Sequence, residues 1–271
     1  MRTFPCAKIN LGLYVVERRP DGYHNLETIF YPIPLCDELE VTPSDSDCLT
    51  VEGLSVDGDW HDNLVWRVVK QLRELGHSVP PVSIRLRKIT PMGAGLGGGS
   101  SDAAHTMTML NQMFQLGLSE DEMERMLAKL GADCPFFVRC KPVFATGIGD
   151  KFQPASIDLS GLHLLLVKPS DHVSTREAYS LVHPQQPKHS LLESIQRPIS
   201  EWQQLIANDF EQSVFPNHPT IADIKQRLID NGALYAAMSG SGSAVFGLFA
   251  QAPTPEFIAS FEPHFTFTSS L

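Results

Sequence analysis

Apolar side chains recur along the chain with two periods, one typical of strands and one typical of helices. They alternate with polar residues over 6–16 and again over 82–86, which predicts two half-buried strands. They recur every three or four residues after Asn63, after Ser101 and after Ser119, which predicts three amphipathic helices. The chain is therefore expected to combine sheet and helix.

Capping residues and glycines predict where the helices begin and end. Asn63 is an N-capping residue type, and Ser119 can form a capping box with Glu122. A buried strand is predicted over 163–167, whereas 184–198 is predicted to be a polar surface insertion. Glycine follows the last apolar residue of these helical patterns, as is common at helix C-termini. The predicted starts and stops are Asn63 and Gly76, Ser119 and Gly131, and Thr220 and Gly232.

A glycine-rich segment lies between the predicted strand 82–86 and the helix that follows Ser101. Five of the seven residues from 93 to 99 are glycine, which removes Cβ atoms and permits positive φ, so a ligand can approach the backbone. Free amides and the positive end of the helix dipole then converge on one point, which favours a bound phosphate. The predicted phosphate-binding residues are Pro91, Met92, Gly93, Ala94, Gly95, Leu96, Gly97, Gly98, Gly99, Ser100 and Ser101.

Four other interpretations of this glycine segment are weaker. Its spacing fits G-x-G-x-x-G, but a dinucleotide site also needs an acidic residue about 20 positions later at the end of a second strand. The acidic residues found there, 120–122, open a helix instead. No Gly-Lys-Ser/Thr follows, the protein-kinase companion motifs are absent, and a glycine turn without a ligand is the remaining alternative. The segment resembles the central ATP motif of the galactokinase, homoserine kinase, mevalonate kinase and phosphomevalonate kinase (GHMP) superfamily.

Composition narrows the class of protein. The chain has 271 residues, of which 42% are hydrophobic, enough for one large or two ordinary domains. Its net charge of −10 and the absence of a Lys/Arg run argue against a nucleic-acid partner. No apolar run approaches the length of about 18 residues that a membrane span requires. Its five cysteines, without a C-x-x-C pair, are interpreted as small buried residues in a cytoplasmic protein.

The segment from 7 to 28 reads A-K-I-N-L-G-L-Y-V-V-E-R-R-P-D-G-Y-H-N-L-E-T. Lys8 and Asn10 share one face of the predicted strand, where the two side chains could hold an anion. Tyr23 and His24 follow a Pro-Asp-Gly turn, where they could stack on a nucleobase and bond its edge. Each pair is also common on ordinary protein surfaces. The whole segment, however, resembles the first motif of the GHMP branch that acts on 4-diphosphocytidyl-2-C-methyl-D-erythritol, apart from Cys6, where that branch usually carries Ala.

Further segments extend this resemblance. Asp133 lies between Gly131 and Pro135, where a turn-capping aspartate is the simplest interpretation of the residues alone. Its surroundings, G-A-D-C-P-F-F, nevertheless resemble the branch's catalytic-aspartate motif. The segment 173–179 resembles its second substrate segment, and 238–249 resembles the superfamily's third motif, which packs beside the phosphate loop. The resemblance also implies that Asn63 lies near the adenine base and that Thr175 and Tyr179 face the cytidine.

The fold that the resemblance implies is the α+β, two-subdomain GHMP kinase fold. An N-terminal, ribosomal-protein-S5-like ATP half is expected over residues 1–155, and a C-terminal, ferredoxin-like half over 156–271. The reaction implied is transfer of the γ-phosphoryl group of ATP, with Mg²⁺, to the 2-hydroxyl of the cytidyl substrate, a step of non-mevalonate isoprenoid biosynthesis. A kinase for another small alcohol and a non-catalytic nucleotide or sugar sensor are the alternatives. We expect a monomer or weak homodimer without a membrane partner.

The resemblance assigns a role to each candidate residue. Asp133 would accept the hydroxyl proton, and Lys8 would keep Asp133 ionised while binding phosphate oxygens. Because a nearby cation also makes a carboxylate a weaker base, we expect Lys8 to act mainly through geometry and charge. Asn10 would orient the substrate's diphosphate. The cytosine would lie between Tyr23 and Tyr179, with its edge bonded by His24, while Ser100 and Ser101 are the only candidates for metal ligands.

Overall fold

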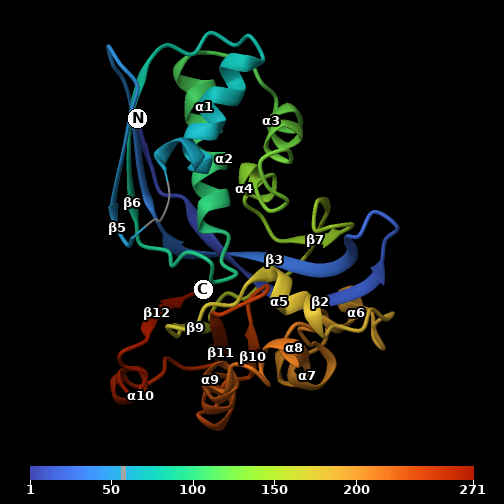
Figure 1. The fold of residues 1–271 in the computed structure, drawn as a ribbon. Helices are drawn as coiled ribbons and strands as arrows, with labels where there is room; N and C mark the ends of the chain where they lie inside the picture. Colours follow the sequence, from blue (N-terminus) through green and yellow to red (C-terminus); the bar gives the residue numbers. More distant parts are fainter. Residues whose placement is uncertain (56–58) are drawn as a thin grey trace. The chain divides into compact units, whose positions relative to one another are not determined.

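The alternating segments predicted from the sequence form strands β2 (Cys6–Arg18) and β6 (Val82–Lys88) of a computed structural model that describes residues 1–55 and 59–271 (Figure 1). The predicted buried strand is also present, as β9 (His163–Lys168). The chain divides into two units, and each is described here by itself. Unit 1 contains residues 1–8, 35–92 and 97–141, and unit 2 contains residues 9–34, 93–96 and 142–271.

Unit 1 contains a four-stranded sheet in the order β1-β4-β6-β5, in which β5 runs parallel to β6 and the other neighbours are antiparallel. Helices α1 and α2 pack on each other, and α2 also packs on β4 (Figure 1). The remaining elements of this unit are β1 (Arg2–Thr3), β4 (Glu38–Pro43), β5 (Cys48–Gly53), the short 3-10 helix η1 (Trp60–Asp62), α1 (Leu64–Glu74), α2 (Gly98–Met113), α3 (Glu120–Leu127) and α4 (Phe136–Arg139).

Unit 2 contains two four-stranded sheets, in the orders β2-β3-β7-β8 and β10-β11-β9-β12. Helix α9 covers the second sheet, where Ile221, Ile224 and Leu228 belong to the same buried cluster as side chains of β9, β10 and β11. The other elements are β3 (His24–Cys36), β7 (Val143–Thr146), β8 (Lys151–Pro154), α5 (Thr175–Ser180), α6 (Leu191–Ser194), α7 (Ile199–Leu205), α8 (Glu211–Val214), α9 (Pro219–Asp230), β10 (Tyr235–Met238), β11 (Val245–Phe249), α10 (Pro255–Ala259) and β12 (Phe265–Ser270).

Helix starts are confirmed where a side chain caps the helix. Asn63 caps α1 by accepting a hydrogen bond from the Val65 amide at 3.0 Å, and Ser119 forms the predicted capping box with Glu122. Gly76, at the predicted stop of α1, has a φ of 86°. These signals are local in the sequence, which is why they could be read without the fold.

Three helix boundaries were predicted wrongly. Helix α2 begins at Gly98, before the Ser100–Asp102 group, because Gly97 with a φ of 70° is its N-cap. Helix α3 ends at Leu127, ahead of Gly131, because the chain tightens into a turn in which the Leu130 amide bonds the Leu127 carbonyl at 2.9 Å. Helix α9 begins at Pro219, one residue before Thr220, because proline suits the first helical position.

The prediction that 184–198 is only a polar surface insertion was also wrong. This segment contains α6, whose Leu191 is 1% exposed. A Cβ atom placed on Gly12 of β2 would lie 2.8 Å from Leu191 Cδ1, so the leucine packs directly on the backbone of that strand. No helix among the residues described is both long and apolar enough to cross a membrane. The division of the sequence after residue 155 stays a prediction.

Candidate active site

The glycine segment meets a lysine and an aromatic side chain in unit 1. A Cβ atom on Gly97 would lie 2.8 Å from Phe137 Cζ and 3.3 Å from Lys8 Cγ, closer than these atoms can approach without moving. Gly99, by contrast, faces open space, since its Cβ would meet only Leu64 Cδ1 at 3.9 Å. The first turn of α2 therefore packs tightly against Lys8 on one side and leaves room for a ligand on the other.

Lys8 forms an ion pair with Asp133 beside this helix start. The distance from Lys8 Nζ to Asp133 Oδ2 is 3.4 Å, and the lysine side chain is 3% exposed whereas the aspartate side chain is 35% exposed. Burial lowers the pKa of Lys8, and the negative charge of Asp133 acts in the opposite direction. The structure thus brings together two of the predicted residues, a buried cation and an accessible carboxylate, next to the glycine turn.

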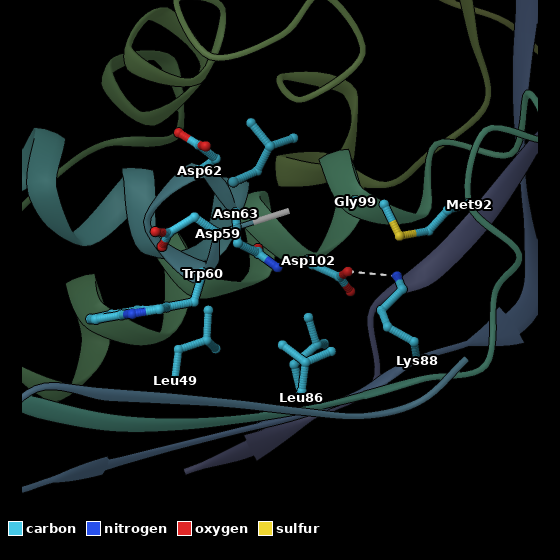
Figure 2. A pocket seen from close by; sticks show the side chains of 12 residues that line it. Leu49, Asp59, Trp60, Asp62, Asn63, Leu86, Lys88, Met92, Gly99 and Asp102 are labelled. Atoms are coloured by element: carbon cyan, nitrogen blue, oxygen red, sulfur yellow. Dashed lines mark hydrogen bonds and ion pairs between the residues drawn. The ribbon is translucent and has the colours of Figure 1, made fainter. Parts of the chain in front are cut away.

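A cavity of about 360 Å³ opens in unit 1 between η1, the sheet and the start of α2 (Figure 2). The Trp60 indole lies on one side of it, the leucines of the sheet lie below, and Lys88 and Asp102 lie at the far end (Figure 2). Such a mostly apolar space with a few polar groups is suited to a flat heteroaromatic ring. Its lining residues are Leu49, Val51, Asp59, Trp60, Asp62, Asn63, Leu64, Leu86, Lys88, Met92, Gly99 and Asp102.

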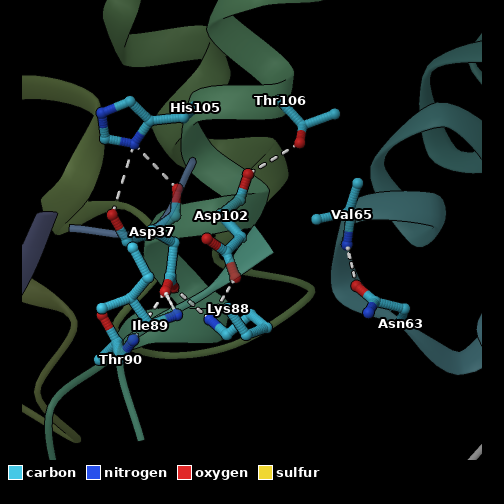
Figure 3. Close-up of polar contacts among 10 residues, drawn as sticks. Asp37, Asn63, Val65, Lys88, Ile89, Thr90, Asp102, His105 and Thr106 are labelled. Carbon is cyan, nitrogen blue, oxygen red and sulfur yellow. Dashed lines mark hydrogen bonds and ion pairs between the residues drawn. The ribbon is translucent and has the colours of Figure 1, made fainter. Parts of the chain in front are cut away.

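A second buried lysine lies at the inner end of this cavity. Lys88 Nζ bonds Asp102 Oδ2 at 2.7 Å and also bonds Asp37 Oδ2 (Figure 3). Asp37 in turn accepts hydrogen bonds from the amides of Ile89 and Thr90 at 2.6 and 2.7 Å. All three charged side chains are at most 2% exposed. The cluster therefore fixes the chain that enters the glycine segment.

The pKa values of Asp102 and Lys88 in this cluster are both raised. Burial raises the pKa of Asp102 to about 7, although the Lys88 ammonium acts to lower it. Burial disfavours the charged form of Lys88 as well, but the carboxylates of Asp102 and Asp37 raise its pKa. Asp102 Oδ1 is buried without a hydrogen-bond partner. Sequence reasoning missed this cluster, because its three residues are far apart in the sequence and Asp37 and Lys88 carry no motif of their own.

In unit 2, Asn10 belongs to a buried polar network. Its Nδ2 donates to Thr28 Oγ1 at 2.8 Å, and its Oδ1 accepts from Ser239 Oγ at 3.4 Å. Ser239 Oγ also lies 2.9 Å from the carbonyl oxygen of Gly95, where a Cβ atom would fall 1.9 Å from the Ser239 carbonyl. The 238–243 turn therefore packs against residues 93–96, as the resemblance to the third motif implies, and Ser239 joins the two segments.

The four residues predicted to contact the cytidine are all in unit 2 but are arranged differently from one another. The His24 ring stacks on Tyr179 with centroids 4.8 Å apart and planes 21° apart. Tyr179 also packs edge-on against Phe210 at 4.7 Å. Tyr23 is 63% exposed, and Thr175 is exposed at the first turn of α5. Burial and the charge of Arg18 lower the pKa of His24, which favours the neutral ring, with one donor and one acceptor nitrogen.

Comparison with known families gives the class of this protein. Residues 63–141 match the GHMP kinases N terminal domain, and residues 190–261 match the GHMP kinases C terminal domain. The chain therefore belongs to the GHMP kinases, and the predicted α+β fold of two subdomains is confirmed. It is an enzyme that transfers a phosphoryl group to a small molecule, with ATP as the donor that the family implies.

Individual relatives carry the name of a particular kinase. The chain is 54% identical over 249 residues, 92% of each chain, to the 4-diphosphocytidyl-2-C-methyl-D-erythritol kinase of Parabacteroides distasonis. It is 52% identical over 253 residues, again 92% of each chain, to the protein of that name from Bacteroides thetaiotaomicron.

Solved structures agree with these relatives. A crystal structure of 4-(cytidine 5'-diphospho)-2C-methyl-D-erythritol kinase matches 99% of this chain and 98% of its own, with a TM-score of 0.79 and 31% identity. The homoserine kinase of Cytophaga hutchinsonii matches 99% of this chain and 93% of its own, with a TM-score of 0.68. At 16% identity, this second structure supports the fold alone.

Proposed function

We propose that this enzyme transfers the γ-phosphoryl group of ATP to the 2-hydroxyl of 4-diphosphocytidyl-2-C-methyl-D-erythritol, a step of non-mevalonate isoprenoid precursor biosynthesis. The observation that carries the proposal is the Lys8–Asp133 pair at the glycine turn, in a chain about half identical to kinases named for this substrate. A kinase for another small alcohol or a non-catalytic sensor would share the fold, but nothing in the site favours either.

The adenine base of the nucleotide is proposed to bind in unit 1. The apolar cavity beside Trp60 and Asn63 would take the adenine, since stacking on an aromatic ring contributes about 1–3 kcal/mol per base. The amides at the start of α2 would bind the phosphates, where Gly99 leaves the required space. The proposed nucleotide-binding residues are Asn63, Pro91, Met92, Gly93, Ala94, Gly95, Leu96, Gly97, Gly98, Gly99, Ser100 and Ser101.

Asp133 is proposed as the group that accepts the proton of the attacking hydroxyl. Its partial exposure allows contact with a substrate, while the buried Lys8 ammonium holds its carboxylate in one position. Phosphoryl transfer depends chiefly on alignment and on charge stabilisation. Positioning the reactants can contribute roughly 7–11 kcal/mol, so the fixed geometry of this pair matters more than the strength of the base.

A magnesium ion is part of the proposal. Among the described residues, no group of three or more His, Cys, Asp or Glu side chains could hold a metal ion by itself. In kinases Mg²⁺ is bound largely by phosphate oxygens and water, with few protein ligands. Of the two candidate ligands in the first turn of α2, the partly exposed Ser100 would supply a hydroxyl, whereas Ser101 is 0% exposed. Once bound, the ion would neutralise negative charge on the phosphates.

The cytidyl substrate is proposed to bind through residues of unit 2. Tyr23 and Tyr179 would stack on the cytosine, His24 would bond its edge, Thr175 would contact the cytidine, and Asn10 would orient the diphosphate. Because His24 now lies on the Tyr179 ring, a base stacked on that face requires the imidazole to swing away. The neutral His24 ring could then offer both a donor and an acceptor.

A cytoplasmic location and a monomeric or weakly dimeric state complete the proposal. Support for the location comes from the cysteines, all five of which are free thiols. Size-exclusion chromatography with light scattering at several concentrations would measure the oligomeric state directly.

Measurement of ADP release tests the proposed activity. Purified protein with MgATP would be offered the cytidyl substrate, mevalonate, homoserine and galactose in separate assays. We expect turnover with the cytidyl substrate alone. Turnover with another alcohol would mean that the segment containing Tyr23 and His24 was misinterpreted, whereas tight ATP binding without any turnover would favour the sensor.

A further inference from the structure

Two cysteines far apart in the sequence lie in contact in unit 1. Cys6 Sγ and Cys140 Sγ are 2.7 Å apart and share a hydrogen bond, although 134 positions separate them. Both side chains are partly buried, and neither cysteine takes part in a disulfide. Neither thiol contributes to the proposed phosphoryl transfer, so the contact needs a separate explanation.

Ordered backbone holds both thiols in place. Cys6 begins strand β2, and the carbonyl of the preceding Pro5 accepts a hydrogen bond from the Asp37 amide at 2.9 Å. Cys140 ends helix α4 in the left-handed conformation, with φ 47°, and its amide bonds the Phe136 carbonyl at 3.0 Å. The two sulfur atoms are therefore held together by a strand and a helix end rather than by loose loops.

The same two segments carry the Lys8–Asp133 pair. Cys6 and Lys8 are two residues apart on β2 and so lie on the same side of that strand. Asp133 and Cys140 stand just before and just after helix α4. A covalent link between the sulfur atoms would consequently join the strand of Lys8 to the segment that follows Asp133.

The two thiols also differ in acidity. The hydrogen bond between the two thiols lowers the pKa of Cys140, whereas the same bond, together with burial, raises the pKa of Cys6. Because the thiolate is the reactive form of cysteine, we expect Cys140 to attack first and Cys6 to react second. Cys36, whose pKa is raised to about 11 chiefly by burial, remains a protonated neighbour.

We propose that Cys6 and Cys140 form a reversible modification site that a hydroperoxide oxidises to a disulfide. The Cys140 thiolate attacks the peroxide oxygen, the O–O bond breaks, and an alcohol or water leaves, so that Cys140 becomes a sulfenic acid. Cys6 sulfur then attacks the Cys140 sulfur and expels water. In total, two thiols lose two electrons and two protons, and one peroxide is reduced.

The disulfide is expected to stabilise unit 1 against unfolding and to leave Lys8 and Asp133 in place. A disulfide bond of about 2.05 Å requires the sulfur atoms to approach by less than about 1 Å from their present distance. Closing a loop that spans 134 positions restricts the unfolded chain. The oxidised protein should therefore unfold at a higher urea concentration and retain its phosphoryl-transfer rate.

Mass spectrometry on the full chain tests the site. Reduced protein would be treated with a small excess of hydrogen peroxide, its remaining thiols alkylated, and its peptides mapped without reduction. We expect one crosslinked peptide pair containing Cys6 and Cys140, which dithiothreitol reverses. Recovery of both cysteines alkylated, or their separate oxidation to sulfinic acids, would overturn the proposal, as would a crosslink that uses Cys36.

Matched variants distinguish stabilisation by the Cys6–Cys140 disulfide from other effects of peroxide. Peroxide should raise the urea midpoint of the wild type and of Cys48→Ser, because Cys48 is exposed on β5 and outside the pair. It should leave the midpoint of Cys140→Ser unchanged, with Cys6→Ala as the second variant if Cys140→Ser does not fold. A disulfide that forms without raising the midpoint would contradict the stabilising role.

Discussion

Unit 1 contains two buried lysines, and the carboxylates that pair with them differ in exposure to solvent. Lys88 lies between Asp37 and Asp102, whose side chains are 0% and 2% exposed, so both of its partners are almost completely shielded from water. Lys8 pairs with Asp133, a carboxylate that keeps 35% of its side chain exposed. Because both lysines are buried, burial of a lysine alone does not identify a reactive site. Exposure of its carboxylate partner distinguishes the pair that can meet a substrate from the cluster that supports the fold.

The substitution Asp133→Asn tests this difference most directly, because it should cause the largest loss of activity. We expect turnover to fall by about a thousandfold, within the range of 10²–10⁴ typical for loss of a general base. MgADP binding, measured by calorimetry, should stay nearly unchanged because the adenine cavity is not touched. A variant that retains near wild-type turnover would remove Asp133 from the mechanism.

Asp37→Asn should affect stability instead of chemistry. It removes one of the two carboxylates that neutralise Lys88 in a fully buried position, so the free energy of unfolding should fall by about 3 kcal/mol. Urea denaturation measures this change. As a control, Asp133→Asn should shift the unfolding free energy by much less, since Asp133 remains partly exposed to water. Equal losses of unfolding free energy in the two variants would contradict the proposed difference between the two lysines.

Asp102 makes the stability of the cluster depend on pH. Because its pKa rises from 3.8 to about 7 on folding, the folded state binds the proton more tightly than the unfolded state. Its contribution to stability is thus complete below about pH 4 and is lost as the pH rises through about 7.

Urea midpoints measured across this pH range would test the Asp102 effect. Asp102→Asn, which keeps an oxygen for Lys88 but cannot ionise, should flatten the dependence. An unchanged pH profile in the variant would mean that another group is responsible.

The smallest expected effect lies in unit 2. His24→Ala should raise the KM for the cytidyl substrate about tenfold, which corresponds to about 1.4 kcal/mol, and should change the KM for ATP little. Steady-state kinetics with each substrate varied in turn would measure both values. Equal changes in the two constants would argue against contact between His24 and the cytosine.

Local signals in the sequence predicted much of the fold. The alternation over 6–16 fixed the strand of Lys8, and the capping box at Ser119 fixed the start of α3. The start of α2 was predicted too late because the N-cap, Gly97, has no side chain to mark it. The buried Leu191 was missed for a different reason, since its packing partner, the backbone of Gly12, is distant in the sequence.

The candidate site was predicted only where a motif is continuous. Lys88 lies 51 positions from Asp37 and 14 from Asp102, so their cluster depends on sheet pairing and helix packing that no local pattern encodes. The cavity walls come from β5 and η1, which carry no chemical motif. In contrast, Lys8, Asp133 and the glycine segment each lie in a short motif, and the resemblance to a family supplied their roles.

The glycine segment also determines which positions an engineer is free to vary. Residue 95 must remain glycine for the chain to fold at all, because a Cβ there would fall 1.9 Å from the Ser239 carbonyl. Residue 99 tolerates a methyl group as far as folding is concerned, since that group would point into open space. A mutant library screened for expression would therefore keep glycine at residue 95 and accept other residues at residue 99.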